Sequence, residues 1–338
     1  MKLRLKIMQT NVYMLPLGKM SNGAAILSDE IYRAVSKDSD KLIDTSFSSS
    51  LYSKYKLYNL LLCFFKVFRL KTRSNVYFCF TPHGFGYIKD CILLLLLISK
   101  GCNVTIHIHN NLGVNNHSIL VRWLMSKSKV IVINEYQKMY YERFAKTTLL
   151  TNSLPIIKSD VEVRDYRSIH ICYLSRISVK KGFFLLKRII ERTRNSNIYI
   201  HVAGQVDPEL KNDFVQLSAL SHVKYYGFVS QQDKINLLNK SSVMLQLSEP
   251  HYEASPLTYI EAKMFGQFIV STPQYALNNY DEKHHHIIAD DSDTEIDRMI
   301  NIVRNIVNQT LSRQIIDLHL KKYSFESYCQ KICLIMES

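Results

Sequence analysis

The sequence predicts an α/β protein made of two domains, and three observations support this prediction. Short apolar runs alternate with stretches of helical period along the chain, which is typical of βα units and of parallel sheets. A length of 338 residues is enough for two domains of ordinary size. Residues 152–167 lack a strand pattern and carry mixed charges. We therefore expect one domain over residues 1–155, a second over 165–322 and a C-terminal helix over 323–338.

In the first domain, residues 76–80 and 104–109 are expected to be core strands. Residues 92–97 lie between them and are expected to form a buried helix. Because strand residues alternate between the two faces of a sheet, His107 and His109 point to the same face.

The second domain shows a regular succession of elements. Residues 171–176 have the composition of a strand. Further along the chain, strands are expected over 223–229, 242–248 and 266–271, with a helix over 233–240. The segment between the last two strands holds the most informative residues of the chain.

Two glutamates, Glu253 and Glu261, stand eight positions apart around a Ser-Pro step. Ser255 is a good N-cap residue and Pro256 is tolerated at the first helical position, so a helix should begin here. Its free N–H groups would suit a diphosphate. Glu261 would lie roughly 8 Å along the axis, at a depth where a carboxylate accepts hydrogen bonds from ribose hydroxyls. Taken alone, the pair also fits an ordinary amphipathic helix with solvated glutamates.

The succession of elements over residues 223–271 resembles the second domain of family 4 glycosyltransferases. These are retaining enzymes of the GT-B fold, in which two Rossmann-like domains face each other across a cleft. Their two glutamates form an E-x7-E signature, often with proline three positions after the first, and Glu253, Pro256 and Glu261 match it. The resemblance implies that a C-terminal helix packs back on the first domain.

A second motif of this family lies upstream, where a strand ends in Gly-Arg and Lys-Gly follows. Arg176, Lys181 and Gly182 have the family's spacing, whereas Ser175 replaces the usual glycine. An arginine and a lysine there can neutralise the charge that develops on a departing diphosphate, in place of a metal. The alternative is a surface Arg and Lys beside a strand end.

The resemblance is weaker in the first half. In the family, a strand there ends in a histidine near the donor sugar, and His109 is the best match. His83 is a candidate for acceptor contact from a loop. Gly23 precedes a helix expected over residues 24–35 and matches the first strand-to-helix loop, although the usual Gly-Gly pair is absent.

The implied site therefore has three parts. Glu261 would hold the ribose, Glu253 the hydroxyls of the donor sugar, and Arg176 and Lys181 the diphosphate. The catalytic candidates are His109 and Glu253. The full set is donor-binding Arg176, Lys181, Ser255, Pro256, Leu257 and Glu261, with Gly23 and His83 in the acceptor loops. We expect no metal and no cofactor, with a nucleotide-diphosphate sugar as donor substrate.

The histidine run 284–286 does not predict a metal site. Three consecutive imidazoles point in different directions and cannot all serve one tetrahedral ion. Asp290, Asp291 and Asp293 follow in a segment expected to be a solvated loop.

Cysteines and apolar runs indicate the compartment. Seven cysteines without a Cys-x-x-Cys pair favour free thiols in a reducing environment. No signal peptide is recognisable at the start, and the longest apolar run, residues 91–98, is far short of the ~20 residues that span a bilayer. We expect a cytoplasmic protein, peripheral on the inner face of the plasma membrane.

Positive charge is concentrated in the first domain. Residues 1–150 carry 21 Lys and Arg against 8 Asp and Glu, whereas the other 188 residues carry 22 against 21. Residues 54–73 are basic, aromatic and free of acids. This composition suits an anionic membrane, although nucleic acid and a core helix with a solvated basic edge remain alternatives.

The sequence thus predicts a metal-independent glycosyltransferase of hexosyl type. Its acceptor would be a polyprenyl-diphosphate-linked saccharide in surface polysaccharide assembly, such as O-antigen or capsule. One alternative is a family 4 transferase with a soluble or protein acceptor, and another is a catalytically inactive GT-B binding protein. Nucleic acid is not expected as a partner, because no recognised binding motif accompanies the charge.

Overall fold

The computed structural model describes residues 11–17, 23–46, 53–157, 164–274 and 284–338, apart from the side chains of residues 53–57 and 59. The chain divides into two compact units. Unit 1 comprises Met1–Asn152 and Phe325–Ser338, and unit 2 comprises Ser153–Ser324.

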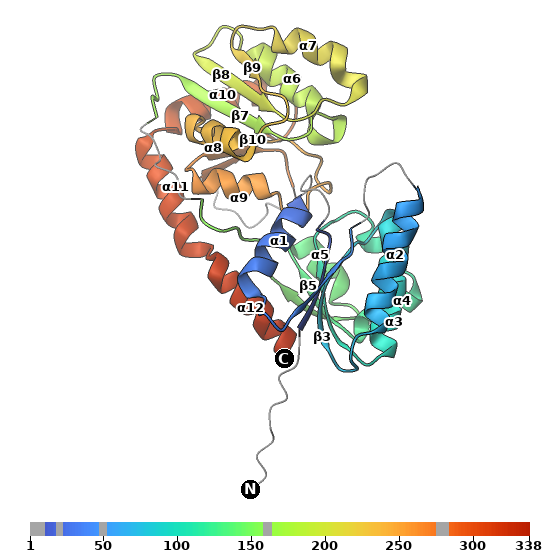
Figure 1. Cartoon of the computed structure of the whole chain (residues 1–338). Coiled ribbons are helices and arrows are strands. Elements are labelled where there is room, and N and C mark those ends of the chain that lie inside the picture. Colours follow the sequence, from blue (N-terminus) through green and yellow to red (C-terminus); the bar gives the residue numbers. More distant parts are fainter. Residues whose placement is uncertain (1–10, 18–22, 47–52, 158–163, 275–283) are drawn as a thin grey trace. The chain divides into compact units, whose positions relative to one another are not determined.

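Unit 1 is built on a six-stranded parallel sheet of order β2-β1-β3-β4-β5-β6. Its strands are β1 (Asn11–Leu15), β2 (Lys41–Asp44), β3 (Asn75–Phe80), β4 (Asn103–Ile108), β5 (Lys129–Val132) and β6 (Lys146–Leu149). Its helices are α1 (Gly23–Val35), α2 (Ser53–Phe68), α3 (Gly84–Ser99), α4 (Ile119–Ser126), α5 (Glu135–Tyr141) and α12 (Phe325–Glu337), with a 3-10 turn η1 (Val114–Asn116). Helices α1 and α12 lie on one face of the sheet, and α2, α3 and α4 lie on the other (Figure 1).

The C-terminal helix α12 is part of unit 1. It packs on α1, β3 and β4, and Tyr328, Cys329 and Ile332 are buried there. Its last turn is held by Lys129 of β5, whose ammonium donates to the carbonyl of Ile335 at 2.8 Å. A cation at this end also complements the helix dipole.

Unit 2 is a second six-stranded parallel sheet, of order β12-β11-β10-β7-β8-β9. Its strands are β7 (Ile169–Leu174), β8 (Ile198–Ala203), β9 (Val223–Tyr225), β10 (Val243–Gln246), β11 (Phe268–Ser271) and β12 (His285–Ile287). Its helices are α6 (Phe183–Arg192), α7 (Lys211–Ser218), α8 (Gln231–Lys240), α9 (Leu257–Met264), α10 (Asp293–Ile306) and α11 (Gln309–Lys322), with 3-10 turns η2 (Val179–Lys181) and η3 (Pro208–Leu210). Helices α6 and α7 cover one face, and α8 and α9 the other (Figure 1).

The strand order of unit 2 reverses between β7 and β10. Strands β7, β8 and β9 continue in one direction, whereas β10, β11 and β12 continue in the other. In open α/β sheets, ligands bind outside the carboxyl ends of the strands at such a point. The loops that follow β7 and β10 are therefore the first place to look for a site.

The predicted α/β class with two Rossmann-like sheets is confirmed, but two elements differ from their predictions. The strand expected over residues 223–229 ends at Tyr225, and Gly227 follows in the left-handed region with a φ of 65°. The helix expected over 92–97 is part of the longer α3, and it is not buried all round, because Ile92 and Leu95 are exposed while Leu93 and Leu94 are buried. None of the helices in the described ranges is long and apolar enough to cross a bilayer.

Candidate functional site

The loop after β7 is folded back on itself by Tyr173. The phenol of this β7 residue donates to the backbone carbonyls of Lys181, at 2.8 Å, and of Arg176, at 3.2 Å. The loop then ends at Gly182, which has a φ of 82° and no room for a side chain. A Cβ there would lie 2.1 Å from the carbonyl oxygen of Leu247. The two loops at the strand-order reversal are therefore in direct backbone contact.

This contact brings Lys181 and Glu253 together. The amide of Glu249 donates to the carbonyl of Lys180 at 3.0 Å, and the Lys181 ammonium donates to the Glu253 carboxylate. The Tyr252 ring lies 5.1 Å from the Lys181 ammonium. Burial lowers the pKa of Lys181 to about 8, while the neighbouring carboxylate favours the charged form. The result is a mostly buried cation and anion at the carboxyl ends of β7 and β10.

Helix α9 begins one residue later than the sequence predicts. Pro256 is the N-cap residue, Leu257 is the first helical residue, and no side chain caps this end. The prediction of Ser255 as N-cap is wrong, because Pro256 has an extended ψ of 122° and so delays the helix. The Ser255 hydroxyl oxygen is buried without a hydrogen-bond partner among the described residues. The Thr258 hydroxyl accepts from the Gln246 amide at 2.7 Å, which joins the first turn to β10.

Glu261 lies in the second turn of α9 and is 6% exposed. Its Oε1 accepts from the ammonium of Lys234, on α8, at 2.5 Å. Burial raises the pKa of the Glu261 carboxyl, and Lys234 opposes that shift. A carboxylate at this depth keeps its second oxygen for another donor, such as a hydroxyl group.

Arg176 has a different environment. Its guanidinium donates to the carboxylate of Asp207, which follows β8, and its side chain is 63% exposed. Lys181, from the same loop, is only 19% exposed. Of the two cations that the sequence assigns to a diphosphate, one is therefore enclosed and the other lies at the solvent edge of its loop.

His109 in unit 1 follows β4 directly. Its Nε2 lies 3.6 Å from the Cys79 Sγ of β3, and Cys79 in turn lies 3.4 Å from the Ser28 hydroxyl. Its ring packs against the His107 ring, with the centroids 3.9 Å apart and the planes tilted by 39°. Burial lowers the pKa of His109 to about 4. At neutral pH His109 is therefore an uncharged imidazole, able to donate or accept a hydrogen bond but not to provide a positive charge.

His107, unlike His109, forms a buried hydrogen bond within the sheet. It is fully buried, and its Nδ1 is hydrogen-bonded to the Tyr77 hydroxyl. Burial and the adjacent His109 hold its pKa well below the usual range.

His83 and Gly23 begin helices at the carboxyl edge of the unit 1 sheet. His83 is the N-cap residue of α3, and its Nε2 is hydrogen-bonded to the Asn110 amide at 3.0 Å. Its loop is pressed against Gly113, where a Cβ would lie 2.4 Å from the Pro82 carbonyl oxygen. Gly23 is exposed and is the first residue of α1. His83, Asn110 and His109 thus come from two neighbouring loops.

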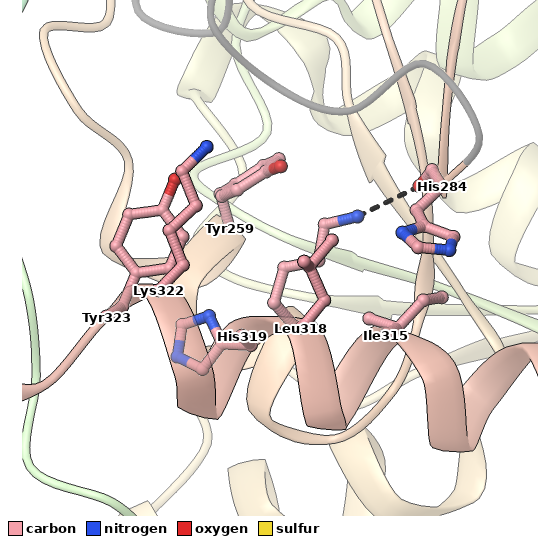
Figure 2. A pocket seen from close by; sticks show the side chains of 8 residues that line it. Tyr259, His284, Ile315, Leu318, His319, Lys322 and Tyr323 are labelled. Atoms are coloured by element: carbon pink, nitrogen blue, oxygen red, sulfur yellow. Dashed lines mark hydrogen bonds between the residues drawn. The ribbon is translucent and has the colours of Figure 1, made fainter.

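A pocket in unit 2 lies between α9 and α11 (Figure 2). Tyr259 and Lys263 line it from α9, and the buried Lys263 ammonium donates to the His284 carbonyl at 2.9 Å. None of the residues predicted to bind a donor lines it. Next to this pocket, α11 packs closely against Gly266. A Cβ on Gly266 would lie 2.5 Å from the carbonyl oxygen of Ser312, on α11.

The histidines of the run 284–286 have separate surroundings. The His285 Nε2 is hydrogen-bonded to the Ser271 hydroxyl at 2.7 Å, and the His286 Nε2 lies 3.5 Å from a Glu295 carboxylate oxygen. Asp290 and Asp291 are exposed in the loop after β12, as the sequence predicts, whereas Asp293 is the exposed first residue of α10 rather than part of a loop. At this surface Arg188 of α6 pairs with both Asp291 and Asp293.

Sequence reasoning missed three residues of the site: Lys234, Asp207 and Tyr252. Each pairs with a predicted residue from another loop or helix. Only Tyr252 had a local signal, as an aromatic residue directly before Glu253.

Comparison with protein families gives one match. Residues 158–313 match the model of the family described as Glycosyl transferases group 1. The matched region lies within unit 2 and contains Arg176, Lys181, Glu253 and Glu261. No curated protein sequence matches the chain significantly.

Solved structures resemble the whole chain. The Anabaena protein HepE in complex with UDP and glucose has a TM-score of 0.71 and 13% identity, covering 98% of this chain and 100% of its own. Sucrose-phosphate synthase from Thermosynechococcus elongatus has a TM-score of 0.72 and 12% identity, covering 97% and 98%.

A third similar structure is the lipopolysaccharide outer core galactosyltransferase WaaB, with a TM-score of 0.64 and 12% identity, covering 97% of this chain and 99% of its own. At such identities the likeness concerns the fold. The chain has the fold of GT-B glycosyltransferases, and its second unit carries the match to the group 1 glycosyl transferases.

Proposed function

We propose that this chain is a retaining family 4 glycosyltransferase that takes a sugar from a nucleotide-diphosphate donor. The observation that carries the proposal is the enclosed pair of Lys181 and Glu253 where the strand order reverses, within the region that matches the group 1 glycosyl transferases. The UDP bound to the similar HepE structure supports a nucleotide donor.

In the proposed complex, unit 2 binds three parts of the donor: the ribose, the diphosphate and the sugar. Glu261 accepts hydrogen bonds from the ribose hydroxyls. The first-turn amides of α9 and the ammonium of Lys181 meet the diphosphate, because both provide positive charge at the carboxyl ends of the strands. Glu253 accepts hydrogen bonds from the sugar hydroxyls. The two charges of the pair thus serve neighbouring parts of one ligand.

Catalysis follows from where charge develops. When the bond between the sugar carbon and the diphosphate oxygen breaks, negative charge grows on the β-phosphate. Lys181 and Arg176 stabilise that charge, and in the proposed mechanism they take the place of a metal ion. His109, uncharged at neutral pH, lines the reaction site through hydrogen bonding.

A panel of sugar nucleotides tests this proposal. We expect UDP-sugars, GDP-sugars or another activated sugar to raise the melting temperature, since a ligand at about 100 times its Kd adds about 2.7 kcal/mol of stability. The stabilising donor should also be hydrolysed or transferred. Stabilisation without turnover would favour the inactive GT-B binding protein, and no stabilisation by any sugar nucleotide would contradict the proposal.

The acceptor that we propose is a polyprenyl-diphosphate-linked saccharide at an anionic membrane. The support comes from one face of unit 1, here called the α2–α4 face, which consists of the outward sides of α2, α3 and α4. These helices cover the same side of the sheet (Figure 1). Large apolar side chains are exposed on all three: Tyr58, Leu61, Leu62, Phe65, Phe68, Phe85, Ile88, Ile92, Leu95, Ile119, Leu120 and Trp123.

The spacing of these side chains follows the helices. On α3, Phe85, Ile88, Ile92 and Leu95 recur at intervals of three and four residues and are 42–69% exposed, so they form an outward apolar stripe. Ile119 on α4 is 87% exposed. Clustered apolar surface of this kind is typical of an interaction site.

The positive charge of the α2–α4 face favours an anionic partner. Exposed basic residues lie on α2 and α4 and in the segments directly after these helices: Lys66, Arg69, Lys71, Arg73, Arg122 and Lys127. The Arg69 guanidinium lies 4.3 Å from the Phe65 ring centroid. Asp90 is the acid of α3, and it is buried beside Lys89. A second copy of this face would repel it, whereas anionic lipid complements both its charge and its apolar side chains.

Vesicle flotation tests the membrane proposal. The wild-type protein should float with vesicles of phosphatidylcholine and phosphatidylglycerol at low salt and be released at high salt, because each basic residue contributes about 1 kcal/mol within a Debye length of the surface. Changing Lys66, Arg69, Lys71 and Arg73 to Glu should abolish binding. The same number of changes at Lys187, Arg194, Lys211 and Lys224 of unit 2 is the matched control. Equal binding to neutral and anionic vesicles would contradict the proposal and favour a soluble acceptor.

A further inference from the structure

Lys234 of α8 faces Glu261, the carboxylate assigned to the ribose of the donor. Its ammonium lies 2.5 Å from Oε1 of Glu261, and the two side chains are 19% and 8% exposed. The lysine is placed by the start of α8, where the Ser230 side chain caps the helix by accepting from the Asp233 amide. Lys234 follows that first turn directly, on the side that meets α9.

We propose that Lys234 is a positioning residue that fixes the Glu261 carboxylate for the ribose of the donor. This inference rests on the proposed function, since it concerns the same site. By occupying Oε1, the ammonium fixes the rotation of the carboxylate and leaves Oε2 for the paired ribose hydroxyls. It also keeps a mostly buried carboxyl group ionised, so that both oxygens remain acceptors.

The other charged groups around α9 do not share this role. Lys263, on α9 itself, donates to the His284 carbonyl. From α11, His319 and Lys322 line the separate pocket beside Lys263 (Figure 2). Arg164 donates to the carbonyls of Leu238, on α8, and of Phe265, at the C-terminal end of α9. Strands β10 and β11, on which α9 packs, contain no titratable side chain. Burial raises the pKa of Glu261, and Lys234 is the charged group that counteracts it.

The consequence is a specific dependence of donor affinity on pH. Without Lys234, the Glu261 carboxyl binds its proton at a higher pH, because burial then acts without an opposing cation. A protonated carboxyl has lost an acceptor oxygen, so donor binding weakens as pH falls. In wild-type protein the same loss occurs only at lower pH. Loss of packing alone would weaken binding equally at every pH.

The test measures UDP and GDP binding by calorimetry between pH 5 and 8. We expect Lys234→Met to weaken binding of the preferred nucleotide about tenfold at pH 7 and to move the pH of half-maximal affinity upward by about one unit. Lys234→Arg, which retains the charge, should restore most of the affinity. Lys240→Met, at an exposed lysine of the same helix, is the matched control and should resemble wild type.

A second measurement needs no ligand. In a double-mutant cycle of Lys234→Met and Glu261→Gln, urea unfolding at pH 7 should show a coupling of about fivefold or more in the unfolding equilibrium constant. Parallel pH profiles for wild type and Lys234→Met, or absence of coupling, would overturn the positioning role while leaving the proposed transferase intact. Failure of wild type to bind any nucleotide, with coupling present, would overturn the proposed function and the ribose role together.

Discussion

Lys181 and Glu253 form an ion pair across two loops that are 72 positions apart in the chain. The lysine belongs to the loop after β7 and the glutamate to the loop after β10, and the pair is more than four-fifths buried. Removing one partner of such a pair leaves an uncompensated charge, which costs more than the pair itself contributes. Variants at these positions therefore need a stability measurement beside every activity measurement.

Loss of the two cations should abolish most activity. We expect Lys181→Ala and Arg176→Ala each to lower kcat/KM by orders of magnitude, because uncompensated phosphate charge raises the activation free energy. Each increase of about 1.36 kcal/mol slows the reaction tenfold. Lys181→Ala should be the more severe, since its ammonium is the more enclosed. Activity should persist in EDTA, and Lys211→Ala, an exposed lysine of α7, is the control. Strict dependence on Mg²⁺ or Mn²⁺ would contradict the proposed role of these cations.

Donor affinity should fall as pH rises through about 8, which is the pKa to which burial lowers Lys181. Below that pH the ammonium is charged and attracts the diphosphate, and above it the neutral amine does not. UDP affinity measured from pH 6.5 to 9.5 checks this expectation. In Lys181→Arg the guanidinium stays charged throughout, so its affinity should not decline over this range. A wild-type affinity that is constant up to pH 9.5 would contradict the loss of charge at Lys181 near pH 8.

The ribose assignment predicts weaker donor binding in Glu261→Gln. The substitution keeps the size of the side chain but replaces an acceptor oxygen with a donor, removing a hydrogen bond to a charged group worth about 1.5–3 kcal/mol. Binding of the nucleotide alone should weaken as much as binding of the sugar nucleotide, because the ribose is common to both. Glu191→Gln, at an exposed position of α6, should bind normally. Unchanged affinity in Glu261→Gln would remove the assignment.

Substitutions at the two neighbouring histidines of unit 1, His107 and His109, should have different effects, one on stability and the other on activity. We expect His109→Ala to lower kcat with a small effect on the melting temperature, since this residue is part-exposed at the strand end. His107→Ala should instead destabilise the protein by about 1–3 kcal/mol, because it leaves the buried Tyr77 hydroxyl without its partner. Urea unfolding beside steady-state kinetics tests both. Normal kcat in His109→Ala would exclude it from the reaction site.

Gly182 should not tolerate a side chain. An alanine Cβ would lie 2.1 Å from the Leu247 carbonyl oxygen, and the φ of 82° is unfavourable for alanine. Gly227→Ala is a matched control, because Gly227 has a φ of 65° but nothing within 4 Å of the position that a Cβ would take. Backbone strain alone costs about 1–3 kcal/mol, so Gly182→Ala should lose more stability than Gly227→Ala in urea unfolding. Equal losses of stability in the two variants would mean that the close contact between Gly182 and Leu247 does not contribute to stability.

The sequence predicted the alternation of elements well, because periodicity is a local property. Core strands such as β3 and β4 are rich in β-branched and aromatic residues and are buried along nearly their whole length, as expected for sheets covered on both faces. Element ends were less predictable. The start of α9 moved from Pro256 to Leu257, since the backbone of a proline is equally suited to the N-cap and to the first helical position.

Side-chain partners could not be predicted from the sequence. Glu261 was noticed for its spacing from Glu253, but the lysine that pairs with it lies 27 positions away on another helix. Likewise, the run of residues 54–73 indicated a basic surface, whereas the exposed stripes of α3 and α4 beside it depend on tertiary packing. The side chains of Lys54 and Lys56 in that run lie outside the described residues.

The place of α12 has a consequence for how the protein is made. This helix completes unit 1 by covering β3 and β4, yet it is synthesised only after all of unit 2. Unit 2 is continuous in sequence and can fold during synthesis. Unit 1, whose strands are all synthesised before unit 2, must wait with an apolar face uncovered until α12 has been made. Nascent chains stalled before Phe325 should therefore bind chaperones through the uncovered apolar face of unit 1.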